Sequence, residues 1–178
     1  HRRWLRGLRF EIAAQQLVFD DNLRAVELGE ERVKDLETRL AEEAEREPWA
    51  EPVRCLMAFR GIGLVTAFSL VAELHGFARF SSPRQLMAYL GLVPSERSSG
   101  DRRRQGPLTK TGNRHVRRLL VEAAWHYRHR AYTGVLLRAR RRQAPTWAVT
   151  IAERAEHRLH RRLWRLINRG KPSPKALA

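Results

Sequence analysis

The residues best suited to chemistry lie in one stretch, SSGDRRRQGPLTKTGNRHVRRLL, between Ser98 and Leu120. Two adjacent serines, Ser98 and Ser99, precede a glycine and three consecutive arginines. A serine hydroxyl can attack a phosphodiester, and guanidinium groups can neutralise the charge that develops during such an attack. The same residues also fit a basic surface loop that only contacts nucleic acid, so the local chemistry leaves both interpretations open.

The second half of this stretch predicts an anion-binding helix start. The Asn113 side chain is a good N-cap, because it can accept a hydrogen bond from a free amide of the first turn. Free amides and the positive end of the helix dipole favour a phosphate there. We therefore predict that phosphate is bound by Arg102, Arg103, Arg104, Lys110, Asn113, Arg114, Arg117 and Arg118.

A further glycine-rich turn, Gly61-Ile62-Gly63, lies between two apolar stretches in LMAFRGIGLVTAFSLVAEL. Glycines allow a tight turn, and the helix that follows begins with unpaired amides. This pattern is typical of a helix-hairpin-helix, so we predict that Arg60, Gly61 and Gly63 contact a nucleic-acid backbone. The alternative is a plain helical hairpin that packs the core.

A metal centre is not expected in this chain. Metal-dependent nuclease chemistry needs clustered carboxylates, and the six acidic residues of 52–178 are widely scattered. The histidine pairs His126/His129 and His157/His160 have helical spacing, but no cysteine or carboxylate pair accompanies them to complete a zinc site.

Charge divides the 178 residues into two parts and predicts a domain boundary. Residues 1–51 carry 9 basic and 13 acidic side chains, whereas residues 52–178 carry 26 basic and 6 acidic side chains. The large excess of positive charge in residues 52–178 indicates a polyanionic partner. Arginine greatly outnumbers lysine, which favours forked contacts to phosphate.

Cysteine usage and hydropathy indicate the compartment. The single Cys55 excludes an internal disulfide framework, and no apolar run approaches the ~20 residues of a membrane span. We expect a cytoplasmic protein with no membrane partner. Because the sequence starts at His1 rather than at a methionine, we also expect it to be part of a longer protein.

The hydrophobic pattern predicts a mainly α fold. Residues 10–47 form one long helix with apolar residues every seven positions, but the second heptad column is mostly polar. This pattern indicates a solvated, coiled-coil-like arm or an oligomer contact rather than a strict coiled coil. Residues 52–178 are expected to form a helical domain, with a loop or short β-hairpin near 94–110 because turn-forming residues are frequent there.

The run from Leu56 to Trp125 closely resembles the C-terminal transposase domain of the insertion-sequence one-ten family, with its one-sixteen and nine-oh-two relatives. The matching strings are FRGIGLVTAFSLVAEL, LMAYLGLVPSERSSGDRRRQGPLTKTGN and RRLLVEAAW. The acidic helix before them resembles the coiled-coil linker of that family. About two-fifths of the chain is covered by the resemblance.

The resemblance implies a DNA transposase or site-specific recombinase of bacterial, nucleoid-associated location. In that family a serine forms a covalent phosphoserine link to DNA, a structured bridge RNA pairs with donor and target DNA, and a RuvC-like domain holds magnesium. Carried over, the nucleophile is Ser99, with Ser98 as the fallback. No RuvC-like domain is found in this sequence, so the chain alone is expected to be inactive.

Two other functions compete with the recombinase. One is a non-catalytic helix-hairpin-helix module that binds DNA or RNA. The other is an oligomerisation scaffold, in which the long helix assembles a dimer or tetramer and the basic face is incidental.

Overall fold

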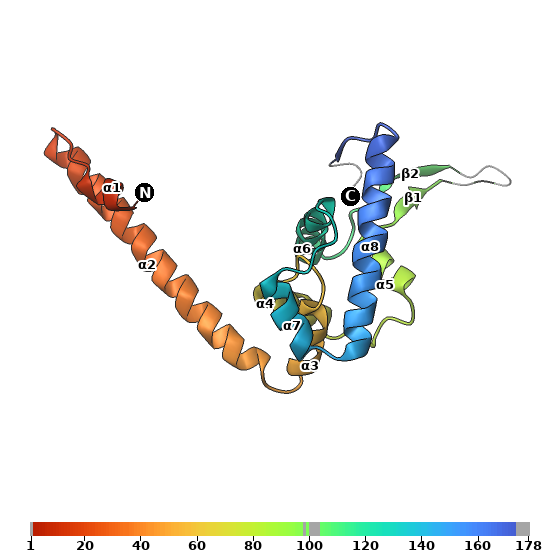
Figure 1. Ribbon diagram of the computed structural model, residues 1–178. Helices are drawn as coiled ribbons and strands as arrows, with labels where there is room; N and C mark the ends of the chain where they lie inside the picture. The colour runs from red at the N-terminus through yellow and green to blue at the C-terminus, as the bar shows by residue number, and fades with distance from the viewer. Residues whose placement is uncertain (1, 98, 100–103, 174–178) are drawn as a thin grey trace. The chain divides into compact units, whose positions relative to one another are not determined.

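The computed structural model describes residues 2–97, 99 and 104–173 and divides the chain into two compact units, residues 1–43 and 44–178 (Figure 1). Helices dominate both units, which confirms the predicted mainly α fold. Ala44 and Ala50 are buried with the second unit. This burial is why the second unit starts earlier than the charge boundary at residues 51 and 52.

The first unit contains α1 (Arg2–Gly7) and α2 (Ala13–Ala44) except for the last residue of α2, Ala44, which belongs to the second unit. The long helix that heptad spacing predicts is therefore confirmed, and it continues without a break through Gly29. Ion pairs from Arg2 to Glu30 and from Arg6 to Glu27 connect α1 to α2. Most of the apolar side chains of α2 are exposed, because the described part of this unit contains nothing that buries them.

The core of the second unit lies among α3 (Ala50–Met57), α4 (Leu64–Leu74) and α6 (Arg114–Trp125). Each of these helices carries small or branched apolar residues at helical spacing, so each buries one continuous stripe. Aromatic packing between Trp49 and Phe68, with centroids 5.3 Å apart, closes one side. The buried cluster includes Val53, Ile62, Ala67, Leu70, Val71, Leu74, Leu90, Val116 and Ala123.

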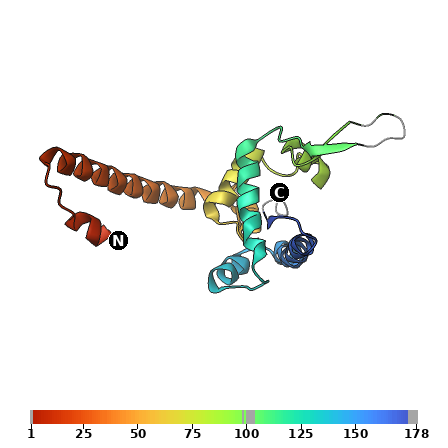
Figure 2. The same cartoon turned by 90° about the horizontal axis from the view of Figure 1, so that it is seen from above.

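Two further helices, α7 (Val135–Gln143) and α8 (Thr146–Asn168), contact α3 from the C-terminal part of the chain (Figure 2). Ala148, Ala152 and Leu163 are buried on α8. None of the described helices is both long enough and apolar enough to span a bilayer.

The helix that Asn113 begins is α6, which ends at Trp125, where a 3-10 turn, η1 (His126–Arg128), follows. Side chains of α8 take up the carbonyls that a longer helix would use. His160 Nδ1 lies 2.9 Å from the Tyr127 carbonyl oxygen, and Trp164 Nε1 donates to the Arg128 carbonyl at 3.2 Å. Local periodicity contains no information about these tertiary bonds.

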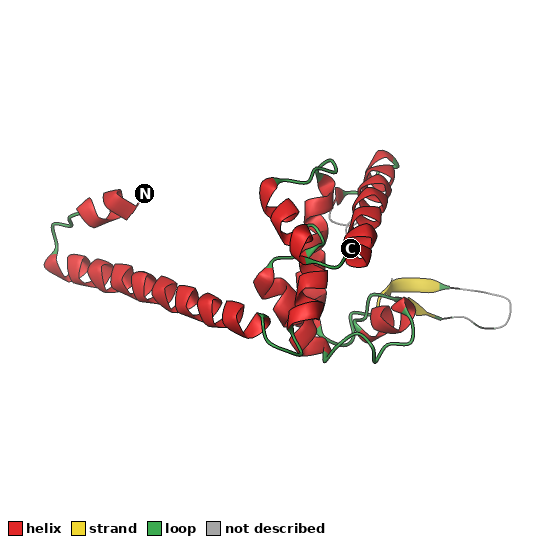
Figure 3. Cartoon of the chain, turned by 60° about the horizontal axis from the view of Figure 1, so that its bottom comes forward, coloured by secondary structure: helices red, strands yellow, loops and turns green. Residues whose placement is uncertain are grey.

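A short antiparallel hairpin follows α5 (Pro83–Tyr89) and extends from the helices of the second unit (Figure 3). Its strands are β1 (Pro94–Glu96) and β2 (Gln105–Leu108), with Pro94 opposite Leu108. Of the two alternatives predicted near 94–110, the structure therefore contains the β-hairpin.

Two glycines fix the base of this hairpin. Gly91 and Gly112 have φ values of 65° and 80°, which side chains rarely adopt. A Cβ on Gly91 would collide with the Thr111 backbone, and one on Gly112 would collide with the Tyr89 carbonyl. The segment before α6 is therefore held directly against the end of α5.

Candidate nucleic-acid interface

The predicted N-cap of α6 is confirmed. Asn113 Oδ1 accepts a hydrogen bond from the Val116 amide at 3.0 Å. The other side of the same amide group, Nδ2, donates to Glu73 Oε2 on α4 at 2.6 Å. Asn113 therefore does more than cap the helix, because it also attaches the start of α6 to α4.

Glu73 also contacts His115 Nδ1 through its second oxygen, Oε1. The hydrogen bond from Asn113, followed by that from His115, lowers the pKa of Glu73 below its ordinary value of 4.5. A carboxylate with a lowered folded-state pKa stabilises the fold above its unfolded pKa and loses this contribution as pH falls through the folded value.

We expect Glu73→Gln to reduce the acid sensitivity of the second unit. At pH 7 the variant should unfold at a lower urea concentration than the unaltered chain, because the charged acceptor is lost. The difference should shrink as pH falls below about 4.5, where Glu73 itself becomes protonated. Urea unfolding followed by circular dichroism at several pH values measures this difference, and a difference that stays constant with pH would contradict the assignment.

Four of the predicted phosphate-binding residues meet at the base of the hairpin. They line a pocket of about 440 Å³, which we call the hairpin-base pocket. Glu122 is the acidic residue in its lining. The lining residues are Leu92, Leu108, Lys110, Arg114, Arg117, Arg118, Val121 and Glu122.

The four cations of this pocket are not equivalent. Arg117 Nη1 donates to the carbonyls of Leu90, at 2.8 Å, and Thr111, at 3.0 Å, so it connects α5 to the segment before α6. Arg118 forms an exposed ion pair with Glu122 at 3.3 Å. Lys110 and Arg114 are exposed. These two are therefore best suited to bind an external phosphate.

Ser99 is exposed and lies in the segment that joins β1 to β2. Next to this segment, the Arg97 amide donates to the Arg104 carbonyl at 2.8 Å and extends the strand pairing. Arg104 is also exposed. The fallback nucleophile Ser98 and the predicted contacts Arg102 and Arg103 lie outside the described residues.

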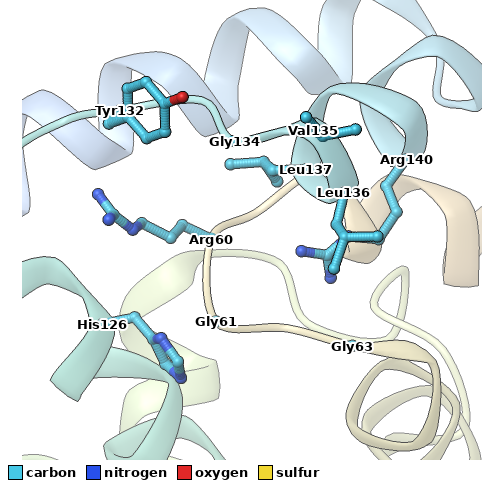
Figure 4. Close-up of a pocket in the computed structure, with 10 residues that line it drawn as sticks. All are labelled: Arg60, Gly61, Gly63, His126, Tyr132, Gly134, Val135, Leu136, Leu137 and Arg140. Carbon is cyan, nitrogen blue, oxygen red and sulfur yellow. The ribbon is translucent and has the colours of Figure 1, made fainter.

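The turn between α3 and α4 lines a separate pocket of about 560 Å³ (Figure 4). Gly61 has a φ of 82° and lies against α6, since a Cβ there would be 2.6 Å from the Ala123 carbonyl oxygen. Gly63 precedes the first turn of α4, and a Cβ on it would meet nothing. The two helices and the glycine turn are present, and phosphate contact by this turn stays a prediction.

Arg60, predicted to contact phosphate, has a structural role in the described unit. Its Nη1 donates to the Arg130 carbonyl at 2.7 Å and to Glu156 Oε1 at 3.0 Å. Only 17% of its side chain is exposed. In the same pocket, Arg140 Nη1 donates to the Ile62 carbonyl. Burial, followed by the nearby Arg141, lowers the pKa of Arg140.

A buried ionic cluster around Glu156 escaped prediction from sequence. Arg141 Nη2 lies 2.9 Å from Glu156 Oε2, and its Nε donates to the Ala58 carbonyl at 3.1 Å. Burial, with the Glu156 carboxylate as the second cause, raises the pKa of Tyr127 to about 12. The sequence did contain one sign that Glu156 is buried. It follows Ala148 and Ala152 at four-residue intervals, which places it on the buried face of α8.

Acidic, histidine and cysteine side chains do not gather in groups of three anywhere in the described parts of the chain. These residues therefore do not fit a metal centre of their own. The described residues do contain a cationic pocket, the hairpin-base pocket, at the base of a hairpin that carries the exposed Ser99.

Comparison with known proteins identifies this part of the chain. Residues 53–136 match the model of the Transposase IS116/IS110/IS902 family. The chain is 37% identical over 171 residues to putative transposase y4qE of Sinorhizobium fredii, covering 96% of the chain and 40% of that relative. It is 31% identical over 164 residues to the transposase for insertion sequence element IS1533 of Leptospira borgpetersenii, covering 91% of the chain and 47% of that relative.

The chain thus spans less than half the length of either relative. The matched region contains α4, α5, the hairpin and α6, and it includes every residue of the hairpin-base pocket. Residues 53–136 therefore carry a transposase domain of the IS116/IS110/IS902 family.

Proposed function

We propose that this chain is the DNA-handling part of a transposase, in which Ser99 attacks a DNA phosphate while the hairpin-base pocket holds the adjoining backbone. The observation that carries this proposal is the convergence of Lys110, Arg114, Arg117 and Arg118 at the base of the hairpin that carries Ser99. Guanidinium and ammonium groups placed in this way bind phosphate and stabilise added negative charge.

In the proposed step, the Ser99 hydroxyl loses its proton and its oxygen bonds to phosphorus. The bond from phosphorus to one deoxyribose oxygen breaks, and that oxygen leaves as a hydroxyl after taking up a proton. The covalent phosphoserine conserves the phosphodiester bond energy. A second strand can then rejoin by the reverse attack without a nucleotide cofactor. Lys110 and Arg114 would neutralise charge on the phosphate during both attacks.

The remaining components of the proposal follow from the family resemblance. A RuvC-like domain outside this chain would hold magnesium, since the described residues do not fit a metal site. A structured bridge RNA would select donor and target DNA. The protein would act on DNA in the bacterial cytoplasm, at the nucleoid. The exposed apolar side chains of α2, among them Val26, Val33 and Leu36, support a dimer or tetramer formed through this helix.

If Lys110 and Arg114 contact DNA phosphates, the double variant Lys110→Gln/Arg114→Gln should bind duplex DNA more weakly. Each phosphate contact contributes about −0.9 to the slope of log affinity against log salt concentration on duplex DNA. Removing two contacts should therefore make that slope shallower by up to about 1.8. Fluorescence anisotropy with a labelled duplex at several salt concentrations measures it.

The double variant Arg24→Gln/Arg32→Gln is the matched control, because it removes the same charge from exposed positions of α2. It should retain the original slope, as should Ser99→Ala. Equal effects of the two double variants would mean that only net charge matters. Such a result would favour the scaffold in which the basic face is incidental.

A further inference from the structure

The strongest charged surface outside the proposed site lies on α8. Six arginines of this helix and its C-cap are exposed, and we call them the α8 arginine face. They lie beyond the region that matches the family model, which ends at residue 136. The members of this face are Arg154, Arg158, Arg161, Arg162, Arg165 and Arg169.

The α8 arginine face is opposite to the side of α8 that packs. Ala148, Ala152, Glu156 and Leu163 are the buried residues of this helix. Successive residues of a helix are rotated by about 100°. Arg154, Arg161 and Arg165 therefore lie roughly half a turn from this buried column, and the other three arginines lie about a quarter to a third of a turn from it. The arginines are therefore not required for the packing of α8 on the rest of the second unit.

Acidic side chains do not balance this face. The two carboxylates of α8 are Glu153 and Glu156, and both interact with Arg141, at 3.5 Å and 2.9 Å. The described residues give the six arginines no ion pair, and Arg161 Nε donates only to the His157 carbonyl of the same helix. The face is thus uncompensated within the described unit.

The spacing of the arginines also opposes helix stability. Arg154/Arg158, Arg158/Arg162, Arg161/Arg165 and Arg165/Arg169 are four like-charged pairs at i,i+4. Like charges at this spacing destabilise a helix. A solvated helix face normally interleaves both signs of charge. A ligand of high negative charge density would relieve this repulsion.

Duplex DNA fits the dimensions of the face. The rise of an α-helix places Arg154 and Arg165 about 16 Å apart along the axis, with Arg158 and Arg161 between them. One strand of duplex DNA presents a phosphate about every 3.4 Å of its axis. A straight row of this length can therefore contact several phosphates, and arginine is the cation best matched to their geometry.

We propose that the α8 arginine face is a second DNA-backbone contact, separate from the hairpin-base pocket. This inference rests on the proposed function in requiring that the chain handles DNA. It adds a surface that lies on another helix and needs neither Ser99 nor the glycine turns. Its partner is the phosphodiester backbone of duplex DNA, bound without base recognition, because phosphate contacts position a duplex but do not specify its sequence.

The test replaces Arg154, Arg158, Arg161 and Arg165 with glutamine in the complete 178-residue chain and measures binding to labelled duplex DNA against salt concentration. The slope of log affinity against log salt concentration should become shallower by up to about 3.6, or about 0.9 for each phosphate contact that is removed. The matched control replaces four exposed arginines of the first unit with glutamine and should keep the salt dependence of the unaltered chain. These arginines are Arg3, Arg24, Arg32 and Arg39. The melting temperature of the α8 variant should be no lower, because repulsion is removed.

The outcomes separate this inference from the proposed function. If the unaltered chain binds no duplex, both are overturned. If it binds and the α8 variant retains the full slope, or if the control variant loses as much, the second contact alone is overturned. Loss of binding to a hairpin RNA with unchanged duplex binding would overturn the assignment to DNA. Loss of self-association instead of DNA binding, measured by sedimentation, would mean that the face binds an acidic surface of a second copy.

Discussion

Replacing Glu156 with alanine should lower the free energy of unfolding of the second unit by about 3–5 kcal/mol, the usual cost of removing one partner from a buried ion pair. The Glu156 side chain is 4% exposed and interacts with Arg60 at 3.0 Å and with Arg141 at 2.9 Å. Its loss leaves the Arg60 guanidinium without a carboxylate and leaves the buried Arg141 guanidinium with the largely exposed Glu153 carboxylate, 3.5 Å away. Their remaining hydrogen bonds to backbone carbonyls do not neutralise charge.

Glu153→Ala on the same helix is the matched control. Glu153 lies 3.5 Å from Arg141, but its side chain is 55% exposed. Exposed ion pairs contribute about 0–1 kcal/mol, so the control should remain close to the unaltered chain. Chemical unfolding of the three proteins measures the difference. If Glu156→Ala is no more destabilising than Glu153→Ala, the ionic cluster does not hold α7 and α8 in place.

Most of the helices could be predicted from the sequence, because their signals are local. The Asn113 cap lies where side-chain chemistry places it, and the apolar pattern identified α2 and the helices on either side of the Gly61-Ile62-Gly63 turn. The end of α6 was not predictable in this way. It depends on bonds from His160 and Trp164, more than thirty residues away in sequence.

The candidate site was only partly predictable for the same reason. Residue types and the order of charges identified Lys110, Arg114, Arg117 and Arg118, which do line one pocket. Sequence could not distinguish an arginine with intramolecular partners from one without them. Arg60 and Arg117 bind backbone carbonyls, whereas no contact of this kind is present at Arg114 in the described residues. This distinction requires the tertiary positions of the carbonyls.

The proposed nucleophile predicts the largest functional effect. With a RuvC-like domain attached, the chain should form a covalent adduct with its DNA that survives denaturation, and Ser99→Ala should abolish that adduct. The reason is chemical, because alanine has no oxygen with which to form the phosphoserine bond. Ser98→Ala should still form the adduct. DNA binding by Ser99→Ala should be unchanged, which separates a lost reaction from a lost complex.

The most direct measurement is therefore denaturing gel electrophoresis of the chain with a RuvC-like domain attached, incubated with radiolabelled DNA that carries the proposed element ends and with the bridge RNA proposed to guide it. We expect a slowly migrating protein–DNA band for the unaltered protein and for Ser98→Ala, and none for Ser99→Ala. A band of undiminished intensity from Ser99→Ala, or its absence from an unaltered protein that binds the same DNA, would contradict this expectation.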